Sequence, residues 1–273
     1  MTTLLCSFME NNYLCLKPLI AVSNINDFFS FTNRVNHVSE EDQKQAINYL
    51  ASIDAFARTT YKSLYVIDYE KKGFDYVSEN PLFLCGNTAE EVEKMGYAFY
   101  FKHVLESDLE LLLKINTIGF EFYERVPMEE RKDYTISYDF HLMHKNGTKT
   151  LVNHKMTPLF MTSEGKLWKA IAIVSLSSEH KSGNVKVTHK KGNKVFHYDL
   201  KGNYWKETEL VKLTDREKEI LIHSTRGYTI NEIAQAIFVS PDTVKFHRKK
   251  LFEKLGVANI SEAITYSTNN RLI

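Results

Sequence analysis

The clearest chemistry in the sequence belongs to a group of cations on one predicted helix. Lys245, Arg248 and Lys249 occupy positions i, i+3 and i+4 of a helix predicted over residues 241–255, with Phe246 beside them. Side chains at this spacing share one face of a helix. Such a face fits the major groove of DNA, where it meets phosphates and base edges. The alternative is a solvated basic face that binds nothing.

The residues around this face predict four short helices, near 215–226, 229–237, 241–255 and 260–270. Thr214, Thr229, Ser240 and Asn259 are of the types that cap helix N-termini. Only residues 238–240 separate the second helix from the third, which is typical of a helix-turn-helix. Apolar residues at helical spacing predict its core, namely Ile220, Leu221, Ile233, Ala234, Ile237, Val239, Val244, Leu251, Leu255, Ala263 and Ile264.

Charge is distributed unevenly along the chain. The 273 residues carry 35 Lys and Arg against 34 Asp and Glu, a net charge of +1. Residues 212–273 hold ten basic and seven acidic residues, so the positive excess falls on the predicted helix-turn-helix. Its third helix concentrates this excess through Lys245, Arg248, Lys249, Lys250 and Lys254. This pattern favours an anionic partner.

Composition and motifs argue against several classes of protein. Three cysteines without a CxxC indicate neither a disulfide framework nor a zinc cluster. We find no P-loop, no GxSxG and no metal-spaced histidine pair, so we expect no enzyme. The longest strongly apolar run, residues 170–176, is too short to span a membrane, and residues 1–13 make a poor signal peptide. We therefore expect a cytoplasmic protein.

Residues 61–180 show the period-two alternation of β-strands. They predict a hairpin, then two helical stretches, then a three-stranded antiparallel meander with a turn at Asn146-Gly147. The strands are expected at residues 63–69, 74–79, 134–142, 150–159 and 167–177, and the helices after Thr88 and Ser107.

This order of elements resembles that of a PAS domain. The sequence segments that carry the resemblance are residues 84–92 (LCGNTAEEV), 103–108 (HVLESD) and 138–148. It implies an α+β chain, in which a PAS-like antiparallel sheet with helices precedes the small all-α helix-turn-helix domain. It also implies a sensory or dimerisation role for residues 61–180, with a small apolar pocket between the long helix and the sheet. The expected lining is Leu109, Leu112, Leu113, Ile115, Tyr138, Phe140 and Leu142, unless these residues fill the core completely.

Some PAS domains bind haem or flavin, and four histidines and one cysteine of this region are candidates for those roles. His103 precedes the long helix instead of lying on it, and the strand histidines have an ordinary exposed alternative. Cys85 lies in Leu-Cys-Gly-Asn, which lacks the motif of the flavin-reactive cysteine. We therefore expect no cofactor and no metal. The four histidines are His103, His141, His144 and His154.

Two further segments complete the domain organisation. Residues 1–60 predict an N-terminal helical segment, with a cap at Ser39, that either packs on the next domain or pairs with a second copy. Residues 181–211 predict a small β-meander that links the two domains. The lysines of this linker form either a solvated face or an auxiliary contact with the DNA backbone.

The unit at residues 212–273 resembles the LuxR-type helix-turn-helix. The resemblance implies that the third helix reads the major groove and that the fourth supports pairing of two copies. Carried over by position, it places Lys245 and Lys249 at base edges or phosphates, and Thr243 and His247 near phosphates. Thr229 and Asn231 are expected at the DNA backbone, since helix N-termini favour phosphate. Phe246 is expected beside a thymine methyl, and Arg248 on the same cationic face. The matching segments are 213–221, 227, 232–234, 239–247, 254–257, 259 and 263.

These observations predict a dimeric bacterial transcriptional regulator that binds specific DNA sequences and is controlled by a small ligand in its PAS-like domain. In the alternative, that domain is a ligand-free protein-interaction or dimerisation module. In a third interpretation, the helix-turn-helix contacts RNA polymerase. The expected partners are therefore double-stranded DNA, a second copy of the chain and a small molecule, with RNA polymerase as a further candidate and no membrane.

Overall fold

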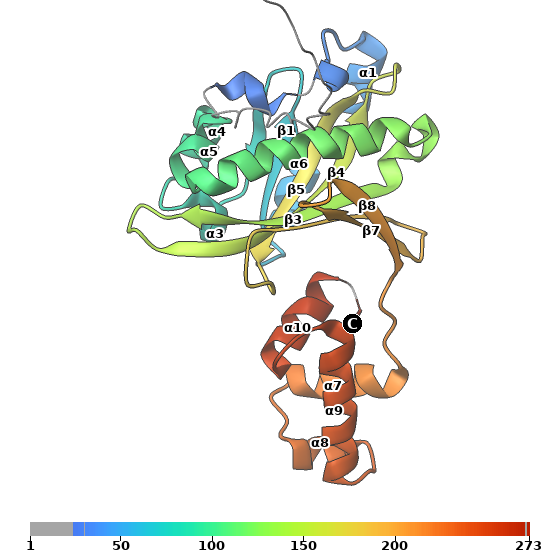
Figure 1. Cartoon of the computed structure of the whole chain (residues 1–273). Helices are drawn as coiled ribbons and strands as arrows, with labels where there is room; N and C mark the ends of the chain where they lie inside the picture. Colours follow the sequence, from blue (N-terminus) through green and yellow to red (C-terminus); the bar gives the residue numbers. More distant parts are fainter. Residues whose placement is uncertain (1–23, 30, 271) are drawn as a thin grey trace, which may run out of the picture.

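The computed structural model describes residues 24–29, 31–270 and 272–273, which form an α+β domain followed by a small helical domain (Figure 1). Residues 1–23 of the predicted N-terminal segment lie outside the described residues. The two domains are joined by residues 210–214, between the last strand and the first helix of the helical domain.

One antiparallel sheet of eight strands organises the first domain, in the order β2-β1-β5-β4-β3-β6-β7-β8. The hairpin of β1 and β2, the intervening helices and the meander of β3, β4 and β5 follow the PAS-like order expected from the sequence. The strands are β1 (Ser63–Asp68), β2 (Gly73–Val77), β3 (Tyr134–Met143), β4 (Lys149–Met161), β5 (Leu167–Leu176), β6 (Gly183–His189), β7 (Lys194–Asp199) and β8 (Tyr204–Glu209).

Helices cover one face of this sheet, and the longest, α6, crosses it (Figure 1). The core between them is rich in aromatic rings; Tyr65, Phe83 and Phe99 are fully buried. The alternation predicted for β3 is confirmed where Phe140 and Leu142 enter this core. The helices are α3 (Pro81–Leu84), α4 (Ala89–Met95), α5 (Ala98–His103) and α6 (Glu106–Arg125), and the 3-10 turn η3 (Met128–Asp133) follows α6.

The described part of the N-terminal segment is less helical than its sequence predicts. It contains η1 (Ile25–Phe28), η2 (Phe31–Asn33), α1 (Glu40–Gln45) and α2 (Tyr49–Ala57). Ser39 caps α1 as expected, because its hydroxyl accepts a hydrogen bond from the Asp42 N–H. The helical segment is interrupted at Asn48, whose left-handed φ of 60° separates α1 from α2. The Tyr49 hydroxyl then fixes α2 to the sheet through the Asp75 carboxylate, at 2.6 Å.

The meander at residues 181–211, predicted as a link between the domains, is part of the sheet of the first domain. Its strands extend the sheet, since β6 pairs with β3 and places Val187 opposite Ile136. Val185 and Val187 are both buried, and Val185 packs with Ile115 and Ile118 of α6. Burial of these alternating valines favours the sheet edge over a free linker.

Candidate nucleic-acid interface and ligand cavity

The C-terminal domain consists of α7 (Asp215–Thr225), α8 (Ile230–Ala236), α9 (Pro241–Leu255) and α10 (Ile260–Asn269). The four predicted helices are confirmed to within about two residues at each end. Their caps form as the sequence indicates: the side chains of Thr214, Thr229, Ser240 and Asn259 each accept a hydrogen bond from the backbone N–H three residues on. These local bonds set where each helix begins.

A tight turn between α8 and α9 positions the candidate interface. Phe238 takes a φ of 55°, and the Val239 N–H donates to the Ala234 carbonyl at 3.0 Å. Ala234 is buried in a cluster with Ile233 and Val244, so the small side chain lies where α8 and α9 meet. The turn and the buried cluster confirm the helix-turn-helix geometry predicted from the spacing.

The outer face of α9 presents the cations. Val244, Leu251 and Leu255 are buried on the inner side of the helix, whereas Lys245 and Lys249 are exposed. Between them, Phe246 is 53% exposed. The Lys250 ammonium lies 4.5 Å from the centroid of the Phe246 ring. This face therefore combines an apolar surface with positive charge, as an interface with base edges and phosphates requires.

Arg248 and Lys245 already have neighbours and are less available than their spacing suggests. The Arg248 guanidinium lies 5.7 Å from the Phe252 ring centroid, and Arg248 is half-buried at the edge of the face. Lys245 forms an exposed ion pair with Asp242 at 3.0 Å. To bind a phosphate, Arg248 would leave the Phe252 ring and Lys245 would leave the Asp242 carboxylate.

Lys254 lies outside the interface. Its ammonium is 2.6 Å from the buried carboxylate of Glu217 on α7. Burial alone would raise the pKa of Glu217, but the Lys254 ammonium and the Thr214 N–H stabilise the charged form and hold this pKa below its usual value. Lys254 therefore joins α9 to α7, and its positive charge does not belong to the exposed excess predicted from composition.

Two of the four polar residues expected near phosphates already have side-chain hydrogen bonds. Thr229 donates from its hydroxyl to the Glu232 carboxylate at 2.8 Å. Thr243 shares a hydrogen bond of 2.9 Å with the Ser240 hydroxyl, and Asn231 is exposed in the first turn of α8. His247 is half-buried, with its ring centroid 5.6 Å from that of Phe246. Their DNA contacts stay predictions.

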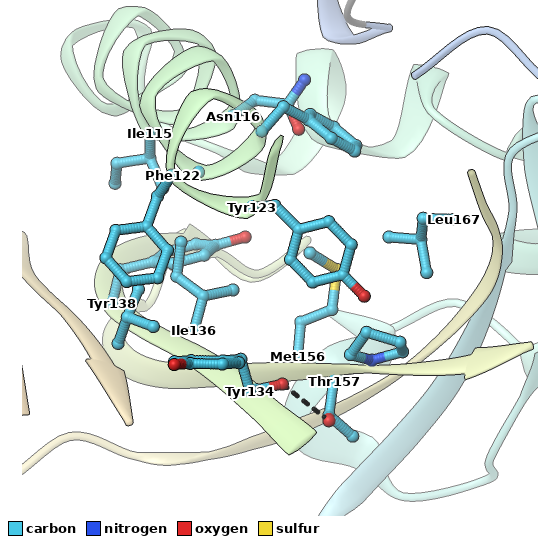
Figure 2. A pocket seen from close by; sticks show the side chains of 14 residues that line it. Ile115, Asn116, Phe122, Tyr123, Tyr134, Ile136, Tyr138, Met156, Thr157 and Leu167 are labelled. Carbon is cyan, nitrogen blue, oxygen red and sulfur yellow. Dashed lines mark hydrogen bonds between the residues drawn. The ribbon is translucent and has the colours of Figure 1, made fainter. Parts of the chain in front are cut away.

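A cavity of about 60 Å³ lies between α6 and the sheet, as expected, but farther along the helix. Figure 2 shows the rings of Phe122, Tyr123 and Tyr138 directed into this space. Of the seven residues predicted to line it, Ile115 and Tyr138 do so, and the other five do not. Leu109, Leu112, Leu113, Phe140 and Leu142 instead belong to the aromatic core or pack against it. Its full lining is Ile115, Asn116, Gly119, Phe120, Phe122, Tyr123, Tyr134, Ile136, Tyr138, Met156, Thr157, Pro158, Leu167 and Val187.

The residues weighed for cofactor chemistry are engaged in the core. Both ring nitrogens of His103 have partners, Asn87 at 2.9 Å and the Met143 carbonyl at 2.9 Å. His154 shares a bond of 2.6 Å with the Tyr65 hydroxyl, and burial lowers its pKa to about 3. Cys85 is fully buried, and burial raises the pKa of its thiol to about 12. These groups would have to give up packing or hydrogen bonds to bind a cofactor.

His141, another of these histidines, also has a side-chain partner. His141 is held by the buried Asp108 carboxylate at 2.9 Å. Within residues 24–29, 31–270 and 272–273, no group of three or more His, Cys, Asp or Glu could hold a metal ion. In the same described part, no helix is long and apolar enough to cross a membrane.

Comparison with known proteins identifies the family of the C-terminal domain. Residues 211–267 match the model of bacterial regulatory proteins of the luxR family. A 70-residue segment is 44% identical to the CsgBAC operon transcriptional regulatory protein of Escherichia coli and to the "Probable csgAB operon transcriptional regulatory protein" of Salmonella typhimurium, covering 25% of this chain and 32% of each of theirs. The chain therefore spans about a third of the length of the curated relatives it matches. Its C-terminal domain is a LuxR-type helix-turn-helix.

Two solved structures are similar over longer stretches at low identity. A Vibrio cholerae VqmA–ligand–DNA complex is 17% identical over 87% of this chain and 90% of that one, with a TM-score of 0.33. A PAS domain from Colwellia psychrerythraea is 13% identical over 48% of this chain and 98% of that one, with a TM-score of 0.36. Likeness at this level indicates nothing about what this chain binds.

Proposed function

We propose that this protein is a sequence-specific DNA-binding transcriptional regulator of the cytoplasm that acts as a homodimer. The observation that carries the proposal is the exposed face of α9, with Lys245, Phe246 and Lys249 on a helix that a LuxR-type domain holds rigidly. Lys249 supplies phosphate or base contact, and the Phe246 ring supplies an apolar surface for a thymine methyl. One short helix covers few base pairs, so two copies read half-sites about one helical turn apart.

Control by a small ligand is the second part of the proposal. The cavity beneath α6 is apolar and aromatic, with Asn116 and Thr157 as polar groups at its wall. Its volume of about 60 Å³ holds only a few atoms, so a metabolite enters after a lining ring such as Phe122 or Tyr134 rotates. The same small volume favours the alternative, in which the PAS-like domain is a ligand-free interaction or dimerisation module.

Selection of duplexes from a random DNA library by the full chain tests the first part. We expect an enriched motif with two-fold symmetry, and binding that weakens steeply with salt. Failure to enrich any motif, with wild-type folding confirmed by circular dichroism, would contradict sequence-specific binding. Thermal-shift screening of the full chain against small aromatic metabolites separates ligand control from the ligand-free alternative.

A further inference from the structure

The C-terminal end of α10 contacts the sheet of the first domain (Figure 1). Asn269, the last residue of α10, is only 8% exposed although it is polar and ends a helix. Its side-chain amide donates to the Leu176 carbonyl at 3.2 Å, and its side-chain oxygen accepts from the Ser175 hydroxyl at 3.3 Å. Its backbone carbonyl accepts a hydrogen bond from the Lys155 ammonium. Asn269 is thus bonded to two neighbouring strands, β4 and β5.

A second contact accompanies this one. The Lys186 ammonium of β6 lies 5.7 Å from the centroid of the Tyr266 ring, one turn earlier on α10. Three strands of the sheet therefore hold the last turn of the helix, at residues far from α10 in the sequence.

The contact is polar and small. The apolar clusters of the described residues each lie within one domain, and none spans the two. Domains joined without a large apolar interface move relative to each other by default. The hydrogen bonds of Asn269 and the Lys186–Tyr266 contact therefore oppose that motion, and interactions of this kind are weak enough to form and break.

Two of the strands that contact α10, β4 and β6, also line the cavity with side chains on their opposite face. Lys155 contacts α10, while its neighbour Met156 lines the cavity. In the same way, Lys186 contacts α10 and its neighbour Val187 lines the cavity. Successive side chains of a strand point to opposite faces, so a shift of β4 or β6 at the cavity moves both surfaces.

We propose that Asn269 is a positioning residue, which holds the DNA-reading domain at one place on the sheet. The contact leaves the Lys245, Phe246 and Lys249 side chains exposed, so it orients the recognition helix without covering it. In a dimer, a fixed position sets the spacing of the two recognition helices. The effect on the spacing of the recognition helices rests on the proposed DNA-binding function. The contact of Asn269 with the sheet does not depend on that function.

Distance measurement in the full chain tests the proposal directly. Spin labels are placed at the exposed Lys149 of β4 and Lys218 of α7, with Cys6 and Cys15 replaced by Ser and the buried Cys85 retained. The parent protein should give one narrow distance distribution. Asn269→Ala and Lys155→Met should each broaden it at least twofold, because the domain then moves about residues 210–214.

Asn270→Ala is the matched control. Asn270 has the same side chain one position later, and its amide donates to the Tyr266 carbonyl within α10. This variant should keep the parent distribution. An unchanged distribution in Asn269→Ala with a parent-like melting temperature, or equal broadening by Asn270→Ala, would overturn the proposal.

A DNA arm separates this proposal from the proposed function. On the selected motif, Asn269→Ala should lose about three- to tenfold in affinity for two half-sites and nothing for one half-site. Equal loss on both duplexes would overturn the positioning role. If the parent protein binds no sequence specifically, the proposed function fails, and the distance measurement still decides whether Asn269 holds the domain.

Discussion

Two lysines of α9 have the same charge but opposite expected roles, and exchanging each for alanine separates them. Lys249 is exposed on the outer face, and no ion pair to it occurs among the described residues. Lys254 is paired at 2.6 Å with the buried Glu217 carboxylate. We expect Lys249→Ala to weaken DNA binding with folding intact, and Lys254→Ala to destabilise the domain with the salt dependence of binding intact.

The size of the first effect follows from counterion release. Each phosphate contact contributes about 0.9 to the slope of log K against log salt concentration. A dimer that loses one contact per subunit loses about 1.8 of that slope. Between 50 and 200 mM salt, a fourfold change, the ratio of wild-type to Lys249→Ala affinity should therefore shrink about twelvefold.

The second effect is one of stability. Lys254→Ala leaves the Glu217 carboxylate buried with only its Thr214 bonds. The Lys254 side chain is about one-third exposed, so water weakens the pair, and we expect a loss of about 1–2 kcal/mol. For a domain of this size, that loss lowers Tm by on the order of 10 °C.

Binding titrations at four salt concentrations and thermal unfolding of both variants provide the measurements. A slope reduced equally by the two substitutions would show that α9 attracts DNA only through its total charge. An unchanged slope for Lys249→Ala would remove Lys249 from the phosphate contacts and refute the reasoning from exposure.

Three further results are expected. The pKa of Glu217 is depressed in the folded protein, so its contribution to stability is present above about pH 4.5 and is lost as the pH falls through the folded pKa. Acid titration followed by circular dichroism should show this loss in the wild type and much less of it in Lys254→Ala. Gly119→Ala places a methyl group 3.1 Å from the Ile136 Cδ1, and the cavity gives Ile136 room to move away. Thermal unfolding should therefore show a gain in stability of about 0.5–1 kcal/mol. A lower Tm would mean that Ile136 cannot move. Ala234→Leu should cost about 1–3 kcal/mol in denaturant unfolding, since the α8–α9 contact has no room for the larger side chain, and an unchanged midpoint would contradict that packing.

Sequence predicted the C-terminal domain closely because its signals are short-range. The hydroxyl of Thr214 or Thr229 meets an N–H three residues away, so the residues that define the cap are neighbours in the chain. The hairpins of the first domain were predicted for the same reason. The pairing of β6 with β3 places Val187 opposite Ile136, about 50 residues away in the sequence. No pattern of neighbouring residues predicts a pairing over that separation.

The role of Lys254 and the place of the cavity were both missed because periodicity assigns a face of a helix and not the neighbour of a side chain. Lys254 has the spacing and charge of a surface cation, but Glu217, on another helix, determines its role. The first half of α6 has an apolar face suited to a pocket, but its Leu109 and Leu112 belong to a core cluster filled with large aromatic rings. Farther along α6, Gly119 lines the cavity and contributes no side chain to it. A glycine on the inward face of a long helix was the signal in the sequence that could have placed the cavity, because a missing side chain removes volume where the helix meets the sheet.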